Sequence, residues 1–211
     1  MGNQCIITTQ NNFQTNGVGI YLYWFGDITC VTAFLKYCEL KGYRSLDVDS
    51  AGFARLCQVI GNFFGSGVSL RIDTLDKLDC QSADNGVYIV QGWDIVRREY
   101  VDDERSPDSI VEWLIDIDNA QPENERLGDY LSGTDVDLAS LELGDTICML
   151  TWEGKSKNVT VLGFGDDITV KGVNVRGIPY GQVYPGELDL SSNLKNYIRS
   201  PRVRLLKKGA A

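Results

Sequence analysis

Residues 17–38 constrain the fold most, because the apolar pattern of the segment GVGIYLYWFGDITCVTAFLKYC changes its period partway along. Its first part is rich in aromatic and β-branched residues, which is typical of a strand. From Ile28 on, apolar residues recur at the i, i+3, i+4 and i+7 spacing of one helix face. Asp27 can cap this helix and Gly42 can end it. The segment therefore predicts a strand that passes directly into a core helix.

The flanking residues predict the rest of an α+β unit. The run CIITT at 5–9 and the strand over 17–25 form a hairpin across the polar loop QNNFQTNG. Alternation along the second strand places Tyr21, Tyr23 and Phe25 on one side, and Ile20, Leu22 and Trp24 on the other. One side should be core, and if it is the side of Ile20, Leu22 and Trp24, the two tyrosines form an outer aromatic patch. A second helix is predicted over 50–64, where apolar residues again recur at helical spacing before GSG. Strands follow in VSLRID and in DNGVYIVQGWDIVRREYV, which makes the unit β-β-α-α-β-β-β.

A third helix is predicted to start at Ser106-Pro107, with serine as the cap and proline in the first turn. Its apolar face comprises Ile110, Trp113, Leu114 and Ile117. Asp108, Glu112 and Asp116 line the opposite face four residues apart. Like charges at this spacing repel by a few tenths of a kcal/mol per pair, so helix stability does not account for them. Solubility and partner binding are both open explanations.

From Leu141 the chain consists of short β-rich runs separated by Gly, Asp and Lys turns. The opening LELGDTI and the meander after it resemble SH3-like barrels over residues 141–197. We therefore predict an α+β protein in three parts. They are an N-terminal antiparallel sheet with two or three helices over 1–119, an acidic connector over 120–140, and a small SH3-like β domain with a basic tail over 141–211.

The side-chain inventory excludes several kinds of chemistry. The sequence has no histidine, so Ser-His-Asp and Cys-His catalysis and the 2-His-1-carboxylate iron site are excluded. The six cysteines never form a C-x-x-C pair, which argues against a zinc knuckle or a redox dithiol. We expect reduced core thiols at Cys5, Cys30, Cys38, Cys57, Cys80 and Cys148. No cofactor, metal or catalytic residue is predicted.

The cell compartment follows from what the sequence does not contain. It has no run of 18 or more apolar residues, and MGNQCIITTQ lacks a positively charged region followed by an apolar one. A cytoplasmic protein with no membrane partner is therefore expected.

Acidic residues are concentrated in one part of the chain. Glu99 to Asp145 contains 15 acidic and two basic residues, a local net charge of −13, whereas the whole chain carries −9. Beyond Asp189 there are six basic residues and no acidic one. A solvated linker over 118–137 is one explanation of this segment. A calcium site is disfavoured, because Asp116, Asp118, Asp135 and Asp137 lack the D-x-D-x-D-G arrangement.

Two further explanations assign the acidic segment a function. Paired carboxylates could catalyse hydrolysis, or a row of carboxylates could imitate a phosphate backbone and bind a basic surface of a partner protein. The candidate partner-binding residues are Asp102, Asp103, Glu104, Asp108, Glu112 and Asp116. The same charge would repel duplex nucleic acid, so direct duplex binding is not expected.

A second candidate site uses the aromatic strand. Tyr21 and Tyr23, together with Arg55, could bind a nucleotide or another small ligand by stacking and charge. The alternative is that another part of the chain covers the two tyrosines.

The segments GIYLYWFGD, VTAFLKYCELKGYRS and ARLCQVIGNFFG resemble uncharacterised small accessory proteins of phages, prophages and mobile elements of Gram-positive bacteria. The resemblance covers residues 4–100. Members of this group often have His and Asn where this chain has Tyr23 and Phe25, so no catalytic role carries over. The resemblance implies a non-enzymatic protein that inhibits a host defence or nucleic-acid-handling protein in the host cytoplasm. A nucleotide-sequestering protein and a carboxylate hydrolase are the alternatives.

Overall fold

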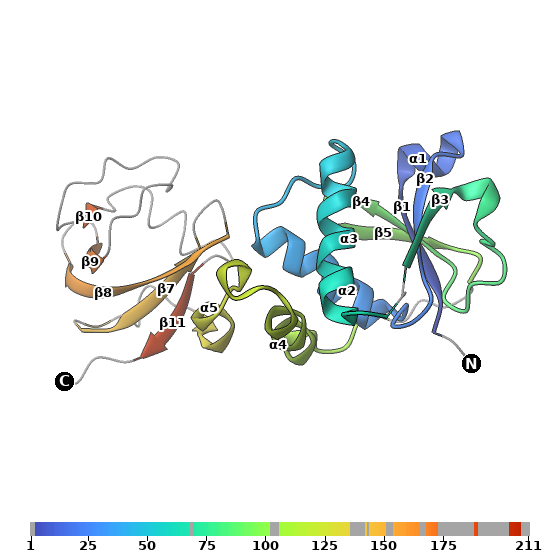
Figure 1. The fold of residues 1–211 in the computed structure, drawn as a ribbon. Helices are drawn as coiled ribbons and strands as arrows, with labels where there is room; N and C mark the ends of the chain where they lie inside the picture. The colour runs from blue at the N-terminus through green and yellow to red at the C-terminus, as the bar shows by residue number, and fades with distance from the viewer. Residues whose placement is uncertain are drawn as a thin grey trace. The chain divides into compact units, whose positions relative to one another are not determined.

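The computed structural model describes residues 3–67, 70–101, 106–135, 142, 144–150, 154–164, 168–172, 188–189 and 203–207. Contacts divide the chain into two units (Figure 1). The first unit comprises Met1–Glu39 and Tyr43–Asn124, and the second comprises Leu40–Gly42 and Glu125–Ala211.

The first unit contains a five-stranded sheet in the order β3-β2-β1-β4-β5. The strands are β1 (Cys5–Thr9), β2 (Val18–Leu22), β3 (Leu70–Thr74), β4 (Val87–Gln91) and β5 (Asp94–Glu99). The predicted α+β class is confirmed. The prediction of an antiparallel sheet is wrong for one pair, because β1 and β4 run parallel and the other neighbours run antiparallel. The long connection from β3 to β4 permits the parallel pairing, since it returns the chain to the other end of the sheet.

The helices of the first unit are α1 (Gln10–Thr15), α2 (Ile28–Leu40), α3 (Ser50–Phe64), α4 (Val111–Ala120) and the 3-10 turn η1 (Leu75–Lys77). The predicted start and end of α2 are confirmed: the Cys30 N–H donates to Asp27 Oδ1 at 3.0 Å, and Gly42 has φ of 69° after the helix. Helix α1 occupies a segment predicted as a loop. Its capping bond from the Asn12 N–H to Thr9 Oγ1 explains how so polar a segment begins a helix.

The predicted start of α4 at Ser106-Pro107 is wrong. The helix begins at Val111, and the Asp108 N–H instead donates to Thr29 Oγ1 at 3.0 Å. This bond links the segment before α4 to the start of α2, so Ser106 and Pro107 belong to a connecting segment and not to the first turn of a helix.

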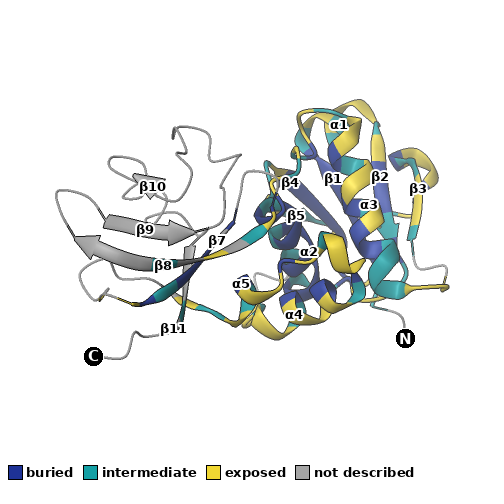
Figure 2. Ribbon diagram, turned by 60° about the vertical axis from the view of Figure 1, so that its left-hand side comes forward, coloured by how far each residue is buried: buried dark blue, intermediate teal, exposed yellow. Residues whose placement is uncertain are grey.

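Apolar side chains cover both faces of the sheet. Ile7, Ile20 and Leu22 lie on one face and are fully buried, whereas Ile6 lies on the other and packs with Leu75 in a cluster that also includes Leu78, Val87 and Ile89. Figure 2 shows the inner strands β1 and β4 largely buried, and helix α3 exposed along its outer side.

The alternation that groups Trp24 with Ile20 and Leu22 is wrong for Trp24, because its side chain is 52% exposed. Strand β2 ends at Leu22, and Phe25 has φ of 55° in the left-handed region. The alternation of sides that holds within a strand therefore does not extend to Trp24.

The second unit contains a six-stranded sheet in the order β10-β9-β8-β7-β11-β6, in which neighbouring strands pair antiparallel. The elements are η2 (Glu123–Glu125, which spans the boundary between the units), α5 (Asp129–Ser132), β6 (Thr134–Asp135), β7 (Thr146–Leu150), β8 (Ser156–Phe164), β9 (Ile168–Gly172), β10 (Leu188–Asp189) and β11 (Val203–Lys207). The predicted SH3-like barrel includes residues outside the described ranges. Residues 120–140, predicted as a connector, include Leu127 and Tyr130, which are buried in the second unit.

Candidate binding surface

Helix α4 is held on the first unit by its inner face. Leu114 and Ile117 are buried, as the periodicity predicted. The Trp113 ring lies 5.5 Å from the Phe25 ring and 6.2 Å from the Phe63 ring, measured between centroids. The carboxylate of Asp118, which is nearly buried, accepts a 2.8 Å hydrogen bond from the Tyr37 hydroxyl. These contacts fix which side of α4 faces outward.

The outer face of α4 combines apolar and acidic side chains. Val111 is 55% exposed and Ile115 is 39% exposed, and Glu112 and Asp116 are exposed beside them. Val111 and Ile115 are four residues apart, as are Glu112 and Asp116, and Glu112 and Ile115 are three apart, so all four side chains lie on one side of the helix. We call Val111, Glu112, Ile115 and Asp116 the α4 surface.

The carboxylates of the α4 surface are not neutralised by neighbours within the described part of the chain. The ion pairs found there use other acidic residues, and neither Glu112 nor Asp116 lies within 4 Å of a lysine or arginine nitrogen in that part. The two charges are therefore available to a cationic partner.

The remaining predicted acidic residues do not extend this helical row. Asp108 is exposed but lies before the helix, where its backbone is bound to Thr29. Asp102, Asp103 and Glu104 lie outside the described residues. Of the six predicted residues, Glu112 and Asp116 are the two that the structure brings together on one helix face.

Sequence reasoning missed the apolar half of this surface. Val111 and Ile115 are four residues apart, which is a helical spacing, but they fall outside the stripe that Leu114 and Ile117 define. A helix with a second apolar stripe next to its core stripe is the signal that could have identified them.

The structure does not bring together the alternative ligand site. Tyr21 and Tyr23 form an edge-on ring pair at 5.0 Å, and the Tyr21 hydroxyl donates to Gln4 Oε1 at 2.6 Å. Tyr21 packs against the Ile6 cluster, so a second part of the chain covers it. Arg55 lies on α3, 5.1 Å from the Tyr43 ring centroid, and donates to Gln58. Its guanidinium is thus engaged away from the two tyrosines.

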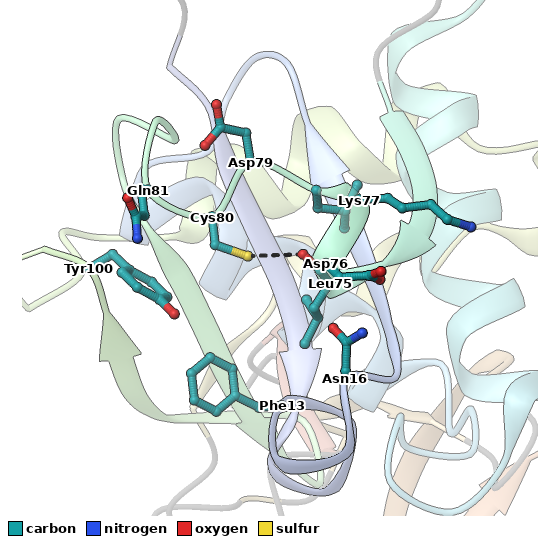
Figure 3. Close-up of a pocket in the computed structure, with 10 residues that line it drawn as sticks. Phe13, Asn16, Leu75, Asp76, Lys77, Asp79, Cys80, Gln81 and Tyr100 are labelled. Atoms are coloured by element: carbon teal, nitrogen blue, oxygen red, sulfur yellow. Dashed lines mark hydrogen bonds between the residues drawn. The ribbon is translucent and has the colours of Figure 1, made fainter.

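A cavity of about 680 Å³ lies over the sheet face that carries Ile6. Figure 3 shows the Phe13 and Tyr100 rings on one side and Asn16 with Leu75 on the other. Three of its lining side chains already have partners in the chain: Cys80 Sγ contacts Leu75 O at 3.6 Å, Asp79 accepts from Ser82, and Lys77 lies 3.4 Å from the Asp73 carboxylate. These three groups therefore do not converge on a ligand.

Two buried carboxylates, those of Asp118 and Asp145, are each hydrogen-bonded within their own unit. Asp118 belongs to the first unit and is bonded to Tyr37, whereas Asp145 belongs to the second unit and accepts a 2.9 Å bond from the Glu142 N–H. Each bond stabilises a local turn or helix contact. Within the described part of the chain, no group of three or more Cys, Asp and Glu residues could hold a metal ion.

The cysteines are poor nucleophiles in this structure. Cys5, Cys30 and Cys38 are buried, and desolvation raises the pKa of each thiol far above its ordinary value. Burial also raises the pKa of Cys57 to about 11. Since the thiolate is the reactive form, these thiols should remain unreactive in the folded protein.

We therefore expect iodoacetamide near pH 8 to leave Cys5, Cys30 and Cys38 unmodified in the native protein and to modify them in denaturant. Half-buried Cys80, whose pKa is raised less, should react first. Peptide mass spectrometry of labelled protein measures this order. Rapid native labelling of Cys30 would contradict the buried placement.

Comparisons with models of known families, with curated proteins and with solved structures find no match for this chain. Among the described residues, no helix has the length and apolar character needed to cross a membrane.

Proposed function

We propose that this chain is a non-enzymatic binding protein that inhibits a host defence or nucleic-acid-handling protein through the α4 surface. The observation that carries the proposal is the pairing of exposed apolar side chains with unneutralised carboxylates on one fixed helix face. Glu112 and Asp116 would attract a basic surface and orient it. Val111 and Ile115 would supply the apolar contact area that makes such an encounter last.

Solubility alone does not account for this combination. A helix face selected only for solvation would carry polar residues throughout, whereas Val111 and Ile115 expose apolar area at a cost. An apolar centre flanked by charges is instead the usual composition of a protein-binding patch. The expected partner therefore carries lysine or arginine around a small apolar contact.

The biological setting is proposed from the sequence resemblance to phage and mobile-element accessory proteins. Such a protein would present its carboxylates where a nuclease or another defence protein binds the phosphate backbone. We also propose that the second unit closes as a small SH3-like barrel, which the antiparallel β7-β8-β9 meander supports.

The test is capture of a basic protein from host lysate by the immobilised full chain in about 0.05 M and about 0.5 M salt. We expect the double variant Glu112→Lys/Asp116→Lys to lose at least about tenfold of the low-salt capture, because two attractive charges become repulsive. The matched control is Asp94→Lys/Glu123→Lys, which makes the same charge change at exposed positions outside α4. Equal loss of capture in both variants would show that net charge, and not the α4 surface, causes the loss, which would contradict the proposal.

A second double variant tests the contribution of the two apolar side chains apart from that of the carboxylates. Val111→Ser/Ile115→Ser keeps both carboxylates, so we expect the captured protein to dissociate several-fold faster at low salt while its association rate changes little. Surface plasmon resonance with the identified partner measures both rates. Unchanged dissociation would show that the apolar half of the α4 surface does not contact the partner.

A further inference from the structure

Strand β3 forms an edge of the first unit's sheet (Figure 1). The pairing of β3 with β2 identifies which of its backbone groups point outward. The Leu75 N–H donates to Gly17 O at 3.0 Å, so Leu75 points toward β2. Antiparallel strands alternate, which means that Arg71 and Asp73 also direct their backbone groups toward β2. Leu70, Ile72 and Thr74 consequently direct theirs away from the sheet. The Thr74 N–H accordingly donates to the Asp73 side chain and not to β2.

The side chains along this edge are apolar on one face and charged on the other. Ile72 is 51% exposed and, with exposed Val18 and Val48, lines a groove of about 520 Å³. Arg71 and Asp73 lie on the opposite face, where they form a 2.8 Å ion pair. An edge strand with an exposed apolar residue is a template for pairing with another strand.

We propose that two copies of this chain pair through β3, antiparallel and centred on Ile72, to form one sheet continuous across both copies. In this register Ile72 lies opposite Ile72 of the second copy, and Leu70 lies opposite Thr74. These are the residues whose backbone groups point outward, so the new ladder uses those groups, with the Thr74 N–H exchanging the Asp73 side chain for Leu70 O of the second copy. On the other face, Arg71 lies opposite Asp73 of the second copy, twice by symmetry.

Charge favours this register over the two neighbouring registers, in which the pairing is centred on Arg71 or on Asp73. In those registers the outward backbone groups of the two copies also lie opposite one another. Centring on Arg71 places two guanidinium groups opposite each other, and centring on Asp73 does the same with two carboxylates. Opposite charges across a strand pair stabilise it, whereas like charges destabilise it. The short sequence LRIDT is therefore complementary to its own antiparallel copy.

The two-fold symmetry also covers apolar surface. Each Ile72 would pack on its equivalent beside the groove that Val18, Val48 and Phe53 line. Self-complementary contact of one patch with itself is the usual geometry of a symmetric dimer. This dimer is separate from the proposed function, because α4 contributes nothing to it.

Sedimentation equilibrium of the full chain from low to high micromolar concentration tests the pairing. We expect a reversible monomer–dimer equilibrium. Arg71→Asp and Asp73→Arg should each weaken dimerisation about tenfold or more, because two attractive pairs become two repulsive ones. The double variant Arg71→Asp/Asp73→Arg exchanges the charges and should return the dimerisation constant to within about threefold of the original value. Because the exchange also restores the ion pair within the strand, the melting temperature of each single variant shows whether its weaker dimer reflects weaker folding.

Ile72→Lys should abolish the dimer. Its matched control is Val96→Lys, which introduces the same charge at a 53% exposed valine on the other edge strand, β5, and should leave the dimer intact. Circular dichroism melting checks that each variant folds. A folded wild-type chain that stays monomeric throughout the range, or an exchange variant that remains as weak as the single ones, would overturn the proposal. Loss of partner capture in Glu112→Lys/Asp116→Lys with the dimer retained would separate the two surfaces.

Discussion

Replacing Gly86 by alanine is expected to lower the free energy of unfolding of the first unit by about 4 kcal/mol. Gly86 has φ of 65°, a conformation that alanine adopts at a cost. A Cβ there would also collide with the Glu99 carbonyl oxygen and lie 2.7 Å from Val101 Cγ2. The backbone has little room to move, because the Gly86 carbonyl accepts the Ile6 N–H at 2.9 Å and so aligns β4 with β1.

Two other glycines distinguish backbone strain from steric collision as the cause of this loss of stability. Gly92 has the same φ of 65°, but a Cβ at this position would have no neighbouring atom within 4 Å, so Gly92→Ala should cost about 1 kcal/mol from backbone strain alone. Gly61 lies inside α3 with equally open space, so Gly61→Ala should stabilise the protein by about 0.5–1 kcal/mol. Urea unfolding followed by tryptophan fluorescence suits this series, since three of the four tryptophans belong to the first unit. Equal losses at Gly86 and Gly92 would mean that the contact with Glu99 is relieved at little cost.

The helices α2 and α3 could be predicted well because local signals mark their ends. Asp27 and Asp49 each cap a first turn, and Gly42 and Gly65 follow the last turns. A cap and a terminal glycine act within a few residues, so the sequence alone carries the information.

The errors occurred where a distant partner decides the local conformation. Trp24 lost its place in the strand pattern because Phe25 turns the chain and packs against Phe63, Phe64 and Trp113. The residues after Ser106 do not join the helix, because the Asp108 N–H is hydrogen-bonded to Thr29, 79 residues away. The parallel pairing of β1 with β4 is likewise a choice between distant strands that periodicity does not encode.

The sequence predicted the acidic residues of the α4 surface but not the apolar residues beside them. The spacing of Glu112 and Asp116 identified a shared side of a helix, since that spacing is local. Which other residues share that side depends on how Trp113 and Leu114 dock, and this depends on aromatic rings from α3 and from the turn after β2. The grouping of Tyr21 with Arg55 depends on information of the same kind, because no sequence spacing reports which face of a sheet a distant helix covers.

Lys41, just beyond α2, has a buried ammonium group that contributes to the second unit. Its Nζ donates to the carbonyl oxygens of Glu125 and Gly154, the latter at 3.2 Å, and lies 3.6 Å from the Glu125 carboxylate. A Cβ on Gly154 would lie 2.6 Å from the Lys41 carbonyl carbon, so this glycine allows the two backbones to approach closely. The lysine thus ties residues 40–42 to two later segments of the same unit.

Lys41→Met is therefore expected to destabilise the second unit by about 3 kcal/mol, because the apolar stem is kept while buried carbonyl groups lose a charged donor. Hydrogen–deuterium exchange should show faster exchange in β7 and β8 and little change in β1 and β4. Lys36→Met is the matched control, since Lys36 lies on α2 with a partly exposed pair to Glu39, and its loss should cost at most about 0.5 kcal/mol. If both variants exchange alike, the buried ammonium group contributes no more than a surface charge, and packing around Gly154 must hold this corner of the unit instead.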